Sequence, residues 1–188
     1  MNRLLIIFIL AVSVSCSEQK ETPAQALNSN AEAEVAAIFP ATNPMNVWDG
    51  KDYKLHVNMI PAADSSYTLQ LRMELYNGAH FISPNAVRDF KGKFTINIED
   101  SEQLETLSKI LETPLSVEEL DPHPFVDGTV NWVRTNTTYT QDFKATTTDD
   151  FYVEGFAIFT IEPACTLEKV RFFIKNNQGE LYAEIARC

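Results

Sequence analysis

The chain has 188 residues, of which 45% are hydrophobic and 22% charged, and this length and composition are typical of one globular domain. Its formal net charge is −11, and no run of five or more basic residues occurs in it. Because nucleic-acid affinity comes largely from Lys and Arg side chains that neutralise phosphates, this charge argues against a nucleic-acid partner. It also predicts little attraction to an anionic membrane surface, so any membrane attachment requires a hydrophobic anchor.

The N-terminus carries the pattern of an export signal. An apolar run covers residues 4–12, directly after Arg3, and is followed by the small-residue stretch Ser13-Val14-Ser15-Cys16. A spanning helix needs about 20 apolar residues, so this run is too short to cross a bilayer. It fits instead the positive start, the apolar middle and the small-residue cleavage site of a signal peptide.

With Cys16 directly after Ser15, this segment resembles the lipobox of bacterial lipoproteins, in a relaxed form familiar in Bacteroidota, since Ser13 stands where Leu is most common. The resemblance implies cleavage before Cys16, lipidation of its thiol and anchoring by several acyl chains. In lipoproteins that stay in the inner membrane, the residue directly after the lipidated cysteine is commonly Asp. Here that residue is Ser17, which favours the outer membrane. A non-lipidated secretory signal and an uncleaved anchor are the alternatives.

The remaining cysteines fit an oxidising compartment. If Cys16 carries lipid, Cys165 and Cys188 are left, and the simplest expectation is a disulfide between them that holds the C-terminus to the body of the domain. A reactive thiol pair is the functional alternative. No C-x-x-C spacing supports it.

Three regions are expected along the chain: a signal peptide over residues 1–15, a lipidated cysteine with a flexible tether over 16–45, and one β-rich globular domain over 46–188. The tether is rich in Ala, Asn, Glu, Ser and Thr and shows no sustained apolar period. Within it, Val35, Ile38 and Phe39 are spaced for a short helix that ends at Pro40.

The globular region begins with alternating apolar and polar residues, the pattern of half-buried strands. Strands are predicted over 53–59, 69–75 and 94–98, with a hairpin connection between the first two. A short amphipathic helix is predicted next, because Asp100 and Ser101 are suitable caps and the apolar residues that follow have 3–4 spacing. These apolar residues are Leu104, Leu107, Ile110 and Leu111.

Further strands are predicted over 130–133 and 135–144, the second as an edge strand because it is polar and rich in Thr. The run 151–161 is apolar in both alternating sets, which predicts a central strand covered on both faces. A hairpin over 170–185 turns at Asn176-Asn177-Gln178-Gly179. The whole pattern predicts a mainly β fold, an antiparallel β-sandwich of the Ig-like or a related kind with one short helix; an open β-barrel is the alternative.

Candidate catalytic residues are few, because the chain lacks a nucleophile elbow, a phosphate-binding glycine loop and a dinucleotide motif. The three histidines have no metal-ligand spacing. His56 and His80 are interpreted as solvent-exposed. His123 lies between prolines, close in sequence to Asp121 and Asp127, so an imidazole and two carboxylates could converge there.

The sequence offers two other kinds of candidate site. Asp142, Asp149 and Asp150 could offer oxygen ligands to calcium, but no EF-hand spacing supports a site, and neither a metal nor a cofactor is predicted. Exposed aromatic rings could contact a peptide or a carbohydrate. Trp48 is placed evenly between this role and core packing, and Trp132 is expected mainly in the core. The other aromatic candidates are Tyr53, Tyr139 and Tyr152.

The function predicted from these patterns is that of a lipid-anchored envelope protein whose β-rich domain binds a protein or glycan partner without catalysing a reaction. Two alternatives stay open. One is a hydrolytic or metal-dependent enzyme with its site near His123, and the other is a carrier of a small hydrophobic ligand held between the sheets.

Overall fold

The structure is a computed structural model that describes residues 46–124 and 126–187. The predicted signal peptide, Cys16, the tether with its Val35–Phe39 helix, and Cys188 lie outside the described residues. The predicted β-rich class is confirmed, because antiparallel strands make up most of the described chain. No helix in the described ranges is long and apolar enough to cross a bilayer.

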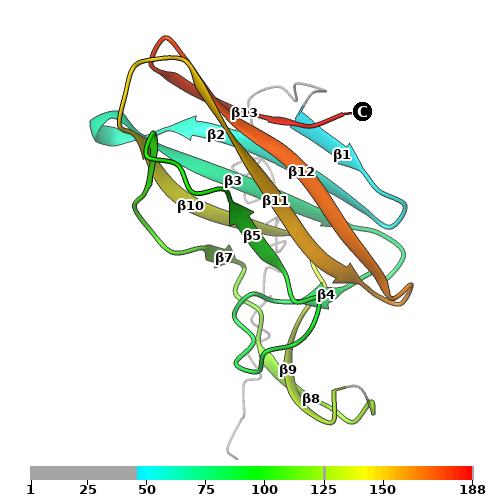
Figure 1. Cartoon of the computed structure of the whole chain (residues 1–188). Helices are drawn as coiled ribbons and strands as arrows, with labels where there is room; N and C mark the ends of the chain where they lie inside the picture. The colour runs from blue at the N-terminus through cyan, green and yellow to red at the C-terminus, as the bar shows by residue number, and fades with distance from the viewer. Residues whose placement is uncertain (1–45, 125, 188) are drawn as a thin grey trace, which may run out of the picture. The chain divides into compact units, whose positions relative to one another are not determined.

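The largest sheet contains six strands, all paired antiparallel (Figure 1). The predicted hairpin of β2 and β3 is confirmed, and in its connection Asp64 and Ser65 have positive φ values of 55° and 59°. The strand order is β1 (Val47–Asp49), β2 (Tyr53–Pro61), β3 (Ser66–Leu75), β10 (Thr137–Ala145) and β6 (Leu104–Thr106), and β7 (Leu111–Thr113) also pairs with β10.

A four-stranded sheet faces the largest one, and a small three-stranded sheet lies beyond one end of the pair (Figure 1). The four-stranded sheet has the order β13 (Glu180–Ile185), β12 (Thr166–Asn177), β11 (Phe151–Ile161) and β5 (Thr95–Ile98). The small sheet has the order β4 (Phe81–Ile82), β9 (Gly128–Val133) and β8 (Glu118–Asp121).

One apolar core fills the space between the two larger sheets, and this arrangement is the predicted sandwich. Alternate residues of β11 and β12 point inward and are buried, as the two-residue period of a strand requires. Aromatic rings dominate the centre: Phe94 stacks on Tyr139 at 4.1 Å between ring centroids, and Tyr53 meets Phe159 edge-on at 5.0 Å. Large rings therefore occupy the space that a hydrophobic-ligand carrier would need to leave open.

The predicted C-terminal hairpin is confirmed. β12 and β13 pair from Asn177 with Glu180 to Phe172 with Ile185. The two turn residues, Gln178 and Gly179, have φ values of 53° and 89°. Two consecutive residues with positive φ form the tight turn whose twist matches that of paired strands, and glycine adopts the second position without strain.

The predicted helix around Leu104 is wrong. Its residues form β6 and β7, two short strands that pair with β10. Leu104 is buried and Ile110 packs against the core, whereas Leu107 and Leu111 are exposed. The 3–4 spacing of these apolar residues therefore does not mark one buried helical face.

Two strand environments also differ from the prediction. β10 is not an edge strand, because β3 pairs with one of its sides and β6 and β7 with the other. Thr137, Tyr139 and Phe143 lie at alternate positions and are buried, as in an interior strand. The polar, Thr-rich residues between them made the sequence of β10 resemble an edge strand. β11 is central as predicted but covered on one face only, since Tyr152 is exposed on the other.

Candidate functional site

The outer face of the four-stranded sheet alternates aromatic and charged side chains. Even-numbered residues of β11 and odd-numbered residues of β12 lie on this face, because the opposite sets are buried in the core. Tyr152 projects from β11 with 68% of its surface exposed. The other side chains of this aromatic and cationic face are Glu154, Phe156, Lys169, Arg171, Phe173 and Lys175.

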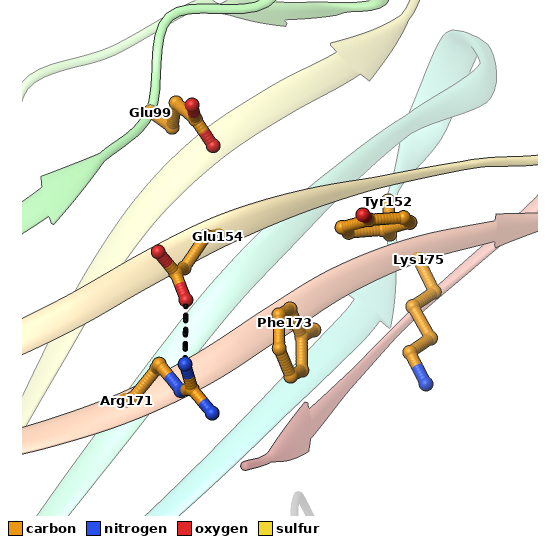
Figure 2. Close-up of a pocket in the computed structure, with 6 residues that line it drawn as sticks. All are labelled: Glu99, Tyr152, Glu154, Arg171, Phe173 and Lys175. Atoms are coloured by element: carbon orange, nitrogen blue, oxygen red, sulfur yellow. Dashed lines mark hydrogen bonds and ion pairs between the residues drawn. The ribbon is translucent and has the colours of Figure 1, made fainter.

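An open hollow of about 490 Å³ lies on this face, and Figure 2 shows its side chains. β11 contributes Tyr152 and Glu154, and β12 contributes three further residues. Glu99, which follows β5, closes one side and is held by a hydrogen bond from its backbone N–H to the carbonyl of Glu154. The β12 residues are Arg171, Phe173 and Lys175.

The charges of the hollow are paired with each other and with the rings. The Arg171 guanidinium lies 3.2 Å from a Glu154 carboxylate oxygen, as Figure 2 shows, and Lys175 pairs with Glu184 of β13. Arg171 also lies 5.5 Å from the centroid of the Phe173 ring, and Tyr152 meets that ring edge-on at 5.8 Å. Exposed ion pairs contribute at most about 1 kcal/mol each, so a partner's carboxylate could compete for these cations at small cost.

Two further hollows adjoin this site. One of about 330 Å³ shares Tyr152 and Lys175 and reaches Tyr182 of β13, so that the two hollows form a band along the outer face. The other, of about 370 Å³, shares Glu99 but lies between β5 and β6, and its lining contains neither a ring nor a cation. An open band lined by rings and cations is suited to an extended surface such as a polypeptide, whereas small-molecule sites enclose most of their ligand.

Sequence reasoning identified only one residue of this hollow, Tyr152, as a candidate. Arg171, Phe173 and Lys175 were not singled out, because charged residues in a strand are ordinary on a solvent-facing side. One sequence signal could have identified the hollow. Cations and an aromatic residue occupy every second position along 169–175, so they lie on the same face of one strand. The other two tyrosines named as candidates, Tyr53 and Tyr139, are buried in the core.

The structure brings together three of the predicted binding residues, Asp121, His123 and Trp132. One carboxylate oxygen of Asp121 accepts the backbone N–H of His123 at 2.8 Å, and the other accepts the indole N–H of Trp132 at 2.9 Å. These two hydrogen bonds, the backbone one first, lower the pKa of Asp121. The predicted core position of Trp132 is wrong, because its ring is only partly buried and packs edge-on against His80 at 4.8 Å.

This cluster does not form a catalytic set. His123 and Asp127 are both exposed, and neither lines any of the three hollows described above. Asp121 is used to close a turn and to orient Trp132. Within the described ranges, no group of three or more His, Cys, Asp or Glu side chains could hold a metal ion. The geometry therefore gives no support to the enzyme alternative at His123.

The other candidate residues contact groups within the fold or lie at its edge. Trp48 lies on the edge strand β1 opposite Leu55 and is partly exposed. The proposed calcium ligands act within the fold: Asp142 accepts the Thr68 hydroxyl at 2.7 Å, and Asp150 accepts the backbone N–H of Gln178 at 2.9 Å. His56 is buried rather than exposed, and its imidazole lies 3.2 Å from Glu74.

The predicted disulfide is not supported, because the described residues contain no disulfide. Cys165 is an exposed free thiol that precedes β12. Cys188, its predicted partner, lies outside the described residues.

Comparisons with known proteins give no family. No protein-family model and no curated protein matches the chain. Two solved structures of the DsbD N-terminal domain from Neisseria meningitidis superpose on it at 10% sequence identity: the reduced form, with a TM-score of 0.42 over 69% of this chain and 90% of that one, and the complex with the PilB N-terminal domain, with a TM-score of 0.40 over 66% and 84%. At these values the likeness carries no functional inference for this chain.

Proposed function

We propose that this chain is an exported lipoprotein, anchored through Cys16 in the outer membrane, whose sandwich domain binds a protein partner without catalysing a reaction. The observation that carries the binding role is the band of hollows on the outer face of the four-stranded sheet. Its central hollow combines an exposed Tyr152, the Phe173 ring and the Arg171 guanidinium. Tyr and Arg are enriched among the residues that dominate the binding energy of protein interfaces.

The band favours a protein over a small ligand because it is open and extended. Rings and cations that already contact each other lose little side-chain entropy when a partner covers them. The paired glutamates leave the hollow without a strong net charge, so shape and apolar contact, rather than charge alone, would select the partner. A glycan is the other partner class that flat rings fit, and the experiment below separates the two.

The anchor rests on the sequence. The apolar run of residues 4–12, the small-residue stretch and Cys16 form a lipobox-like segment. Intact-mass analysis of protein purified from its native membrane tests it: the mass should equal residues 16–188 plus acyl groups, and Cys16→Ser should abolish acylation. A wild-type mass without acyl groups would contradict the anchor.

Site-specific photo-crosslinking in the native envelope tests the binding face. A benzophenone side chain placed at position 152 is expected to form one covalent protein adduct, and Phe173→Ser is expected to reduce it at least tenfold. The control is Leu167→Ser, because Leu167 is an exposed apolar residue of the same strand outside the hollows. It should leave the adduct unchanged.

Two results would overturn this assignment. An adduct that is equally abundant in the Phe173→Ser variant would place the partner elsewhere. Failure to form any protein adduct, together with Phe173-dependent binding on a glycan array, would assign the face to a carbohydrate instead.

A further inference from the structure

Exposed apolar side chains are concentrated in one short stretch of the described chain. Ten large hydrophobic residues are exposed, and five of them fall within residues 107–120. Scattered exposed apolar residues need no explanation, but a group of them marks an interaction surface. The five are Leu107, Leu111, Leu115, Val117 and Leu120; the last three are 67%, 80% and 76% exposed, respectively.

Strand register keeps part of this group outside the core. Leu111 pairs with Thr140, and Glu112 pairs with Tyr139, whose side chain points into the core. Glu112 therefore faces inward, where its carboxylate accepts hydrogen bonds from Ser83, from Asn85 at 2.8 Å and from the backbone N–H of Ser116 at 3.0 Å. Because successive residues alternate, Leu111 must face outward.

β8, at the end of this stretch, is an edge strand with an open side. In the small sheet it pairs with β9 alone. The carbonyl of Asn131 in β9 accepts the N–H of Ser83 on the β4 side, so Asn131 does not bond to its opposite residue, Glu118. In an antiparallel pair such positions alternate, so the backbone groups of Glu118 and Leu120 point away from β9.

The charge of this edge indicates which kind of partner could bind to it. Glu118 and Glu119 are exposed beside Val117 and Leu120, in a chain of net charge −11. A second copy of the chain would bring like charges together along the edge, and an anionic lipid surface would be repelled. A basic segment with apolar residues at alternate positions complements Glu118 on one face of the strand and Val117 on the other, where Glu119 is already paired with Arg134 at 2.8 Å.

We infer that β8 is a docking edge to which an extended, basic and apolar segment of another polypeptide adds as a further strand. Its backbone would bond to Glu118 and Leu120. Its cations would meet Glu118, with their methylene stems beside Leu120 on the same face of the strand, and its apolar side chains would cover Val117 on the opposite face. Strand addition of this kind takes affinity from backbone hydrogen bonds and specificity from alternate side chains. The inference is independent of the aromatic and cationic face proposed above.

Synthetic octapeptides test this inference on the full-length protein in detergent. A peptide of alternating Lys and Val is expected to bind at least tenfold more tightly than one of alternating Glu and Val, as measured by calorimetry. Methylation of the amide nitrogens on one alternate set of the Lys/Val peptide should weaken binding at least tenfold, because that set donates to β8. Methylation of the other set should have little effect.

Variants locate the site. Val117→Ser is expected to weaken the Lys/Val peptide at least tenfold, and Glu118→Lys should reverse the preference in favour of the Glu/Val peptide. Val87→Ser is the matched control, because Val87 is 87% exposed and lies outside the stretch. An equal affinity for both peptides, or no effect of methylation on either set, would overturn the inference. So would a self-association of the chain that Val117→Ser abolishes, because the occupant would then be a second copy.

Discussion

The carboxylate of Asp121 and the indole N–H of Trp132 are joined by a hydrogen bond of 2.9 Å between neighbouring strands of the small sheet. The same carboxylate closes the turn at His123, so one side chain fixes both the loop and the ring. Arg134, whose guanidinium lies 5.5 Å from the Trp132 ring centroid, adds a second contact. Trp132 is therefore a natural reporter of this sheet.

Asp121 should keep Trp132 in one environment down to low pH. Hydrogen bonds to the carboxylate lower its pKa below the ordinary 3.8, so the folded state favours the ionised form. Its stabilising contribution is then present above pH 3.8 and is lost as the pH falls through the lowered value. In a Trp48→Phe/His80→Gln background, which leaves Trp132 as the single tryptophan and removes the imidazole that contacts its ring, emission should stay constant from pH 7 to about 4 and change only below that.

Asp121→Asn checks the assignment, because an amide offers one acceptor oxygen in place of two. Trp132 emission should then differ from wild type already at pH 7, whereas Asp127→Asn should leave it unchanged. A wild-type emission curve in the Asp121→Asn variant would show that the hydrogen bond does not position the ring.

His56 should make the fold sensitive to mild acid. Burial lowers the pKa of its imidazole from the ordinary 6.5, although the neighbouring Glu74 opposes the effect. Because the unfolded chain binds the proton more readily, stability is complete above pH 6.5 and declines as the pH falls toward the lowered value. The slope is at most about 1.4 kcal/mol per pH unit for one proton.

Urea denaturation between pH 7.5 and 5 measures this slope. His56→Gln should remove the part due to this residue, and His80→Gln, a change at a partly buried histidine, should not. An identical slope in wild type and His56→Gln would refute the role of His56.

Glu112 should stabilise the folded state even though it is a buried carboxylate. Three donors, the Ser83 hydroxyl, the Asn85 amide and the Ser116 N–H, converge on its two oxygens. Replacement by Ala leaves these donors without an acceptor, which costs about 1–3 kcal/mol for each buried group that water cannot reach. Glu112→Gln should destabilise by less, since one oxygen remains.

Equilibrium unfolding in urea is the measurement, with Glu105→Gln as the control because Glu105 is an exposed residue of β6. If Glu112→Ala were as stable as the control, the three hydrogen bonds would contribute nothing to the folded state.

The strands that were predicted correctly from the sequence all have one side facing the same core. Tyr53, Leu55 and Val57, like Val170, Phe172 and Ile174, alternate cleanly because one side of each strand faces a common core. Their strands and the sandwich class follow from that period alone.

The failures arise where tertiary contacts override the local pattern. The segment 104–113 has helical spacing, but β10 supplies a backbone partner and two distant donors, Ser83 and Asn85, hold Glu112 inward, so that Leu111 is exposed. No local pattern reveals these partners, which lie about 30 residues away along the chain. The aromatic and cationic face was missed for the related reason that its residues converge from β5, β11 and β12 only after folding.

Gly155 is the one inward position of β11 between Val153 and Ala157 that carries no side chain, and its neighbour explains why. A Cβ atom built there would lie 2.4 Å from the ring of Phe172, its directly paired residue on β12. Gly155→Ala should therefore destabilise the protein by about 1–3 kcal/mol, the usual cost of overpacking a core, as measured by urea denaturation.

A double-mutant cycle separates this clash from the general effect of adding a methyl group to a strand. Phe172→Leu alone should destabilise, because it leaves space in the core. The double variant Gly155→Ala/Phe172→Leu should be more stable than the sum of the two single changes predicts, because the smaller side chain relieves the clash. Contacting residues typically show coupling of about 0.5–3 kcal/mol. Strict additivity would mean that the cost of Gly155→Ala does not come from contact with the Phe172 ring, and that the close packing of β11 on β12 at this pair does not require glycine.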